Sequence, residues 1–119
     1  MRRGAALAVV LAVATGVGAA EGEGLREDLG PEPTGDADVA AFAAISAAFT
    51  RRLQDRFPPG TPVSALRKEL AEEGFVEEGR GTARLEEDGF LCRLLWMVTW
   101  EADMGVLVSV EGAHDGVCL

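Results

Sequence analysis

The stretch "FLCRLLWMVTW", Phe90 to Trp100, alternates between two faces and decides the fold prediction. One face carries Phe90, Cys92, Leu94, Trp96, Val98 and Trp100, and the other carries Leu91, Arg93, Leu95, Met97 and Thr99. A period of two, with aromatic and β-branched residues, predicts a β-strand with one strongly apolar face. We therefore expect the face with both tryptophans to lie in the core.

The residues that follow predict an antiparallel hairpin. "EADMG" (101–105) is typical of a turn, with a glycine suited to positive φ, and "VLVSV" (Val106 to Val110) is typical of a second strand. The expected cross-strand pairs are Trp100 with Val106, Val98 with Val108, and Trp96 with Val110. The tail (111–119) is expected to turn back toward the start of the hairpin.

Cys92 and Cys118 are the only cysteines of the chain. An even pair in an exported protein favours a disulfide, which would stabilise the fold by about 3–4 kcal/mol. Two independent buried thiols are the alternative.

Two amphipathic helices are predicted before this hairpin. Their apolar stripes are Val39, Phe42, Ile45, Phe49, Leu53 and Phe57 in the first helix (39–57), and Val63, Leu66 and Leu70 in the second (62–73). Steps of three and four residues place each stripe on one helix face. Asp36 or Asp38 can cap the first helix.

The stretch "FPPGTPVSALRKELAEEGF" (57–75) separates the two helices and is interpreted as structural rather than as a ligand loop. Pro58 and Pro59 end the first helix, Thr61 is the expected N-cap of the second, and Pro62 suits its first position. Later, Gly74 and Phe75 fit a Schellman motif.

The polar segment 77–89 is predicted to be a loop with a short edge strand around 82–85. Together these elements predict an α+β fold in a single domain, 39–119. Its two N-terminal helices pack on a C-terminal antiparallel sheet of two to three strands.

The first twenty residues, with Arg2 and Arg3 before an apolar run and small residues, predict a secretory signal peptide cleaved after Ala19 or Ala20. Retention as a membrane anchor is the alternative. Residues 21–38 are rich in Gly, Pro and acids, which is typical of a flexible, disordered tether. The expected location is therefore the periplasm or the exterior.

The charge balance disfavours two classes of partner. The chain has 11 Lys and Arg against 20 Asp and Glu, and removing Arg2 and Arg3 with residues 1–20 changes the net charge from −9 to −11. Such a surface repels nucleic acid and anionic lipid headgroups. We expect neither nucleic-acid binding nor stable membrane insertion after cleavage.

The order of elements resembles the SmpA/OmlA-like small periplasmic domains, a family that includes the lipoprotein of the outer-membrane β-barrel assembly machinery. The matching residues are Gly60, Thr61, Val63, Leu66, Trp96, Val98, Asp103, Gly105 and Val110. The resemblance covers about residues 40–112 and implies a two-helix layer on a three-stranded antiparallel sheet, with a binding or assembly role. β-Lactamase-inhibitor-like proteins share that architecture. This chain departs from the family in lacking a lipidated cysteine and in having a cysteine pair.

No pattern in the sequence predicts catalysis, a cofactor or a metal site. His114 is the only histidine, and we interpret it as a turn residue, with a metal site formed with Asp115, Asp103 and Glu101 as the alternative. The serines lack the context of an activated nucleophile.

The outer face of the predicted strand, with Leu91, Arg93, Leu95 and Met97, is the candidate protein-contact site. The alternative is that loop 77–89 or the C-terminal tail covers it. The expected function is a non-catalytic binding or envelope-assembly protein that contacts another envelope protein. A periplasmic enzyme inhibitor, with the acids at 86–88 imitating a substrate's charge, is the second hypothesis, and a small enzyme is the third.

Overall fold

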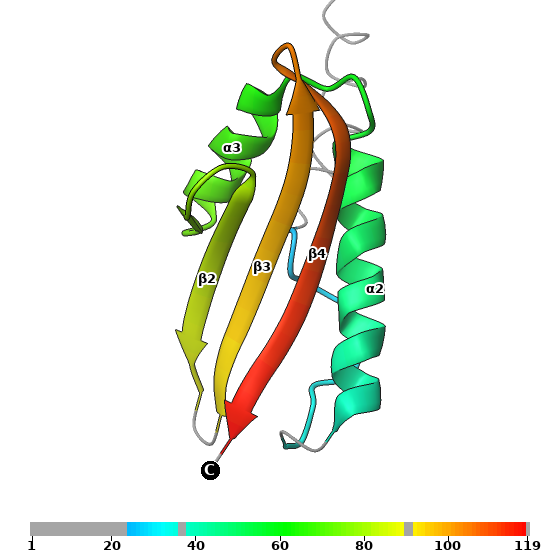
Figure 1. The fold of residues 1–119 in the computed structure, drawn as a ribbon. Helices are drawn as coiled ribbons and strands as arrows, with labels where there is room; N and C mark the ends of the chain where they lie inside the picture. Colours follow the sequence, from blue (N-terminus) through cyan, green and yellow to red (C-terminus); the bar gives the residue numbers. More distant parts are fainter. Residues whose placement is uncertain (1–23, 36–37, 90–91, 119) are drawn as a thin grey trace, which may run out of the picture.

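The computed structural model describes residues 24–35, 38–89 and 92–118, so the predicted signal segment lies outside the described residues. Helices α2 (Val39–Arg56) and α3 (Val63–Glu72) precede the strands β1 (Val76–Glu77), β2 (Thr82–Asp88), β3 (Cys92–Asp103) and β4 (Val106–Cys118). The strands form one antiparallel sheet in the order β1-β2-β3-β4. Figure 1 shows this sheet in front, with α3 behind it and α2 beside β4.

The predicted α+β class, with two helices before an antiparallel sheet, is confirmed, but the described sheet has four strands rather than two to three. The short edge strand predicted around 82–85 is present but longer, because β2 runs from Thr82 to Asp88 and pairs with β3 along its whole length. The fourth strand is β1, which the sequence did not predict. Ala83 is fully buried, while charged side chains occupy the other face of β2. A strand with one polar face is ordinary in an antiparallel sheet that is open to water on one side.

The hairpin forms, but its predicted register is wrong by four residues. The observed pairs are Trp100 with Val110, Val98 with Gly112, and Trp96 with His114. Met104 and Gly105 both have positive φ, 54° and 83°, which allows a two-residue turn and lets β3 continue to Asp103. The predicted turn at 101–105 is therefore mostly strand. The tail reaches the start of the hairpin as expected, but it does so as a continuation of β4.

A bulge in β4 changes which valines face the core. The pairing passes from Ser109 to Leu107 and skips Val108, so one extra residue is accommodated there. As a result Leu107 and Val110 are buried, whereas Val106 and Val108 are exposed. The prediction that Val106, Val108 and Val110 share a buried face is correct only for Val110.

The core lies between the helices and the tryptophan-bearing face of β3, as predicted. Its buried members include Phe42, Ile45, Phe49, Leu53, Phe57, Leu66, Leu70, Phe75, Trp96, Val98 and Trp100. Val39, the first residue of α2, belongs to the predicted stripe but is 69% exposed. The carboxylate of Asp38 accepts a hydrogen bond from the Ala41 N–H and caps α2.

The segment between the helices ends α2 at Arg56 and starts α3 at Val63. Thr61 is not the N-cap, because its hydroxyl donates to the Pro58 carbonyl and Pro62 takes the cap position. At the other end, Gly74 has φ of 98° and the Phe75 N–H donates to the Leu70 carbonyl, which confirms the Schellman motif.

Two glycines of β4 allow α2 to pack unusually close to the sheet. A β-carbon on Gly112 would lie 2.4 Å from the Phe49 ring, and one on Gly116 would lie 2.8 Å from the Phe42 ring. These distances are too short for any side chain. Glycine is therefore required at both positions by the close approach of the helix.

Polar side chains of α2 satisfy the outer backbone edge of β4. The Thr50 hydroxyl accepts a hydrogen bond of 2.9 Å from the Gly112 N–H and donates one of 2.8 Å to the Gly112 carbonyl. The Ser46 hydroxyl bonds the backbone of His114 in the same way. The pairs are Ser46 with His114, Thr50 with Gly112, and Gln54 with Val110. Four helix residues rise about 6 Å and two strand residues about 6.8 Å, so the match holds over the two steps between the three pairs. The edge strand is thereby protected from pairing with another chain.

The segment 24–35 packs on the domain, so the prediction of a free, flexible tether is wrong for these residues. Leu25 is fully buried in the core, and Leu29 packs against it. The Leu25 N–H donates to the Glu73 carboxylate, and Arg26 pairs with Glu73 and Glu87. The two large apolar residues of an otherwise polar segment therefore anchor it.

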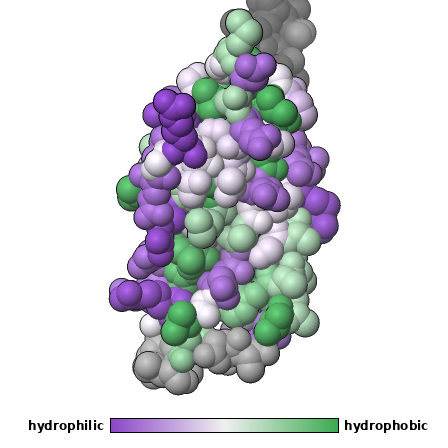
Figure 2. Space-filling view, viewed as in Figure 1, coloured by the Kyte–Doolittle hydropathy of each residue, from purple (hydrophilic) through white to green (hydrophobic). Residues whose placement is uncertain are grey.

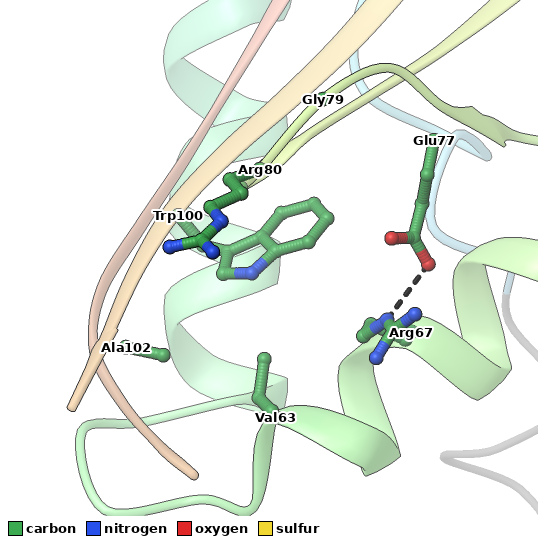
Figure 3. A pocket seen from close by; sticks show the side chains of 8 residues that line it. Val63, Arg67, Glu77, Gly79, Arg80, Trp100 and Ala102 are labelled. Atoms are coloured by element: carbon green, nitrogen blue, oxygen red, sulfur yellow. Dashed lines mark hydrogen bonds and ion pairs between the residues drawn. The ribbon is translucent and has the colours of Figure 1, made fainter. Parts of the chain in front are cut away.

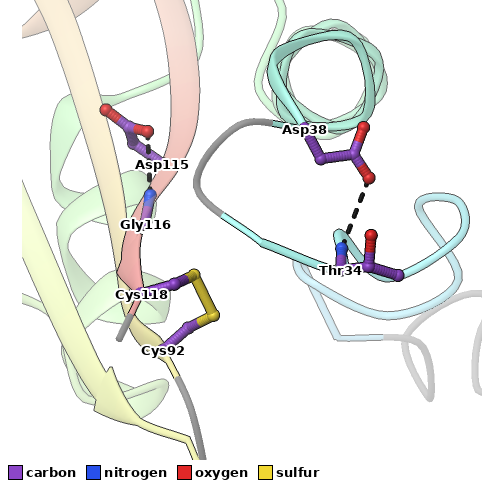
Figure 4. Close-up of a disulfide and its surroundings, with 6 residues drawn as sticks. All are labelled: Thr34, Asp38, Cys92, Asp115, Gly116 and Cys118. Atoms are coloured by element: carbon purple, nitrogen blue, oxygen red, sulfur yellow. Dashed lines mark hydrogen bonds between the residues drawn. A yellow bond between two sulfur atoms is a disulfide. The ribbon is translucent and has the colours of Figure 1, made fainter.

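The disulfide predicted from the sequence joins Cys92 and Cys118, whose Cα atoms are 3.9 Å apart. The two residues are paired in register at the start of β3 and the end of β4. Figure 4 shows the bond crossing between these two strands. It closes the end of the hairpin opposite the Met104–Gly105 turn.

Candidate functional site: the open face of the sheet

The face of the sheet that points away from the helices contains the predicted contact residues. We call it the open face. Its residues on β2, β3 and β4, which follow from the strand register, include Thr82, Arg84, Glu86, Asp88, Arg93, Leu95, Met97, Thr99, Glu101, Ser109, Glu111, Ala113, Asp115 and Val117. Leu95 and Met97 are half-buried and Arg93 is exposed, whereas Leu91 lies outside the described residues.

Neither of the segments proposed to cover this face does so in the described part of the chain. The segment 77–89 contributes β2 and the C-terminal tail contributes β4, on either side of β3 in the same sheet. Both segments extend the sheet sideways instead of crossing it. The covering alternative is therefore wrong for the described residues.

The apolar side chains of the open face are framed by charged neighbours. Leu95 lies between Glu86 and Asp115 in the register, and Met97 lies between Arg84 and Ala113. Their partial burial comes from these cross-strand neighbours. Figure 2, which views this face, shows hydrophobic side chains near its middle and strongly hydrophilic ones along the β2 margin.

Two arginines and three acids form a chain of ion pairs along β2 and β3. Arg93 lies 3.1 Å from Asp88 and 3.8 Å from Glu86, and Arg84 lies 2.7 Å from Glu86 and 3.5 Å from Glu78. Exposed pairs of this kind contribute little to stability. They fix the arrangement of charge beside the apolar residues, which matters for the choice of partner.

His114 lies on the opposite face of the sheet, so its interpretation as a turn residue is wrong. It is a β4 residue with 4% exposure, and its ring stacks on Trp96 with centroids 3.7 Å apart. Its Nδ1 is 3.1 Å from the Leu95 carbonyl, an acceptor, so this nitrogen carries the proton. Burial lowers the pKa of His114, and the hydrogen bond to Leu95 opposes that shift.

The structure does not bring His114 together with its proposed metal-binding partners. Asp115, the next residue on the strand, is on the open face, and Asp103 is at the hairpin turn. Among residues 24–35, 38–89 and 92–118, no group of three or more His, Cys, Asp or Glu side chains is arranged to hold a metal ion. The Ser46 hydroxyl is occupied by the backbone N–H and C=O of His114.

Comparison of the chain with protein-family models, with curated proteins and with solved structures gives no match. The resemblance to SmpA/OmlA-like domains therefore stays a prediction. No helix among the described residues is long and apolar enough to cross a membrane.

Proposed function

We propose that the protein is an exported, non-catalytic binding protein that contacts another envelope protein through the open face. The observation that carries this proposal is the position of Leu95 and Met97, half-buried on a face that no described segment covers. An apolar strip with a charged rim is the usual composition of a protein interface. Docking by strand addition at β4 is disfavoured, because the side chains of α2 already bond that edge.

The inhibitor hypothesis finds less support in the contacts of the acids at 86–88. Glu86 and Asp88 pair with arginines of the open face, and Glu87 pairs with Arg26 and accepts a hydrogen bond from the Trp96 indole. Acids that are already neutralised within the domain are poor imitations of a substrate's free charge. This favours a docking role over charge mimicry.

The experiment places a photo-crosslinking amino acid at Met97 in the full chain, in cells that export it. Ala47, exposed on α2, is the control position. We expect a discrete crosslinked product from position 97 that is weakened by Arg93→Glu and absent from position 47. Equal products from both positions, or none from position 97, would contradict the proposal.

A second variant separates docking from folding. Leu95→Gln with Met97→Gln is expected to lower the free energy of unfolding by less than about 1 kcal/mol per residue, since both side chains are only half-buried. With the photo-crosslinking amino acid moved to Thr99, an exposed position of the open face, the same change should abolish the crosslink. A large loss of stability with unchanged crosslinking would identify the face as structural.

A further inference from the structure

A hollow of about 450 Å³ lies between the start of α3 and the turn that joins β1 to β2 (Figure 3). Its walls include Val63, Arg67, Glu77, Arg80, Trp100 and Ala102. Trp100 belongs to the helix-covered face of β3, so the hollow shares no residue with the open face. Its volume falls within the range of small-ligand sites.

The hollow combines an apolar wall with an uncompensated positive charge. Trp100, Val63 and Ala102 supply apolar surface. The Arg67 guanidinium pairs with Glu77 at 2.8 Å, so these two charges cancel. Arg80 makes no hydrogen bond or ion pair within the described residues, which leaves one net positive charge in a chain whose formal charge is −9.

The backbone around Arg80 holds this side chain at the mouth of the hollow. Gly79 and Gly81 have φ of 68° and 72°, values that favour glycine. The Trp100 N–H donates to the Gly81 carbonyl at 2.9 Å, and a β-carbon on Gly81 would lie 2.5 Å from the Trp100 carbonyl oxygen. The turn is therefore attached to the backbone of Trp100, and Figure 3 shows the Arg80 side chain reaching toward the indole.

The start of α3 adds to the positive potential at this site. Val63, its first residue, lines the hollow, and the helix has neither a side-chain cap nor an acidic residue in its first turn. The Val63 N–H donates to the Gly105 carbonyl at 2.9 Å, but no carboxylate of the first turn offsets the partial positive charge of this helix N-terminus. Alone it would not define a site, but it acts in the same direction as Arg80.

We propose that this hollow binds a carboxylate attached to an apolar body, such as the C-terminal residue of a peptide or a small aromatic acid. The Arg80 guanidinium would pair with the carboxylate through two parallel hydrogen bonds, and the apolar body would lie against Trp100. A singly charged carboxylate fits better than a phosphate, because only one guanidinium is free and the whole chain is acidic.

Nuclear magnetic resonance of the ¹⁵N-labelled chain tests the proposal, because the chain has two tryptophans and hence two indole signals. Trp96→Phe assigns them. The probes are N-acetylphenylalanine and a pentapeptide ending in phenylalanine, each as the acid and as the C-terminal amide. We expect at least one acid to shift the Trp100 signal saturably, and to bind at least about tenfold tighter than its amide.

The two acids distinguish the sources of the carboxylate. Binding of the pentapeptide acid alone assigns the site to polypeptide C-termini, and binding of N-acetylphenylalanine with equal affinity assigns it to small acids. Arg80→Gln should weaken binding at least about tenfold. Arg51→Gln, at an exposed position of α2 outside the hollow, should leave it unchanged.

Three results would overturn the proposal: equal binding of acid and amide, no shift of the Trp100 signal up to about 10 mM probe, or unchanged affinity in Arg80→Gln. Tighter binding of inorganic phosphate than of either acid would also overturn it. Because the wild-type chain serves for the probe comparison, the test does not depend on the folding of any variant.

Discussion

Replacing Gly112 by alanine tests how closely α2 approaches the sheet. The new β-carbon would lie 2.4 Å and 2.7 Å from two ring atoms of Phe49 and 2.8 Å from a methyl group of Leu53. Carbon atoms pack at about 3.5–4.0 Å, so the ring must retreat by roughly 1 Å. Both Phe49 and Leu53 are fully buried, and they cannot retreat unless α2 moves away from β4.

Forcing an extra methyl group into a filled core usually costs about 1–3 kcal/mol. We expect Gly112→Ala to lower the free energy of unfolding by about 2–3 kcal/mol, in the upper part of that range. Three atoms clash at once, and the shift also lengthens the hydrogen bonds between Thr50 and the backbone of residue 112. A small domain has only about 5–15 kcal/mol of stability to lose.

Urea unfolding followed by tryptophan fluorescence measures this change. Trp96 reports on it because its ring meets the Phe49 ring edge-on, with the two centroids 5.1 Å apart. With a slope of about 1–1.5 kcal/mol per molar urea, the midpoint should fall by about 2 M. Gly35→Ala is the control, since no atom lies within 4 Å of its added β-carbon. Combining Gly112→Ala with Phe49→Leu should recover part of the loss. The double variant should lose at least about 0.5 kcal/mol less than the sum of the two separate losses.

A Gly112→Ala protein within about 0.5 kcal/mol of the wild type would refute the close approach of the helix. A penalty that Phe49→Leu does not reduce would place the clash elsewhere. In either case the close approach of α2 would not explain why residue 112 is a glycine, although the strand register could still be correct.

Other changes test separate parts of the fold. Thr50→Val keeps the shape of the side chain but leaves an N–H and a C=O of β4 unpaired, so we expect a loss of about 1–3 kcal/mol and more aggregation by light scattering. His114 has its pKa lowered in the folded state, so the unfolded chain binds the proton more readily. Stability should therefore be constant above about pH 7 and fall as the pH drops through about 6.5, and His114→Phe should flatten this part of the urea-midpoint profile. Leu25→Ala should cost about 2–5 kcal/mol if the N-terminal segment is part of the core, whereas a change below 0.5 kcal/mol would indicate a free tether. Reduction of the Cys92–Cys118 disulfide should lower the melting temperature, with a loss of about 3–4 kcal/mol, and a double serine variant should match the reduced protein.

The features predicted correctly are those that neighbouring residues determine. The stripe of α2, the Schellman motif at Gly74 and the alternation around Trp96 each depend on a local period or a local turn. The hairpin register was missed because it depends on the turn length. Met104 adopts positive φ, which is uncommon outside glycine, and the sequence pattern favoured a longer turn.

The remaining differences come from contacts between distant segments. Leu25 is buried in the core between distant segments, and nothing within its acidic segment indicates this. His114 is placed by its pairing with Trp96 across the hairpin, so the register error also misplaced it. The hollow near Arg80 draws residues from α3, β3 and the β1–β2 turn, and only the topology brings these together.

The arrangement of the sheet limits where a partner can bind. Apart from the hollow beside Trp100, the helix-covered face is filled by the core, and the β4 edge is bonded by the side chains of α2. The open face around Met97 and the hollow around Arg80 each combine apolar area with charge and remain accessible. They lie on opposite faces of β3 and share no side chain, so their variants should act additively. If Arg80→Gln changed crosslinking at position 97, or Leu95→Gln changed carboxylate binding, the two surfaces would have to belong to one site that wraps around the β2 edge.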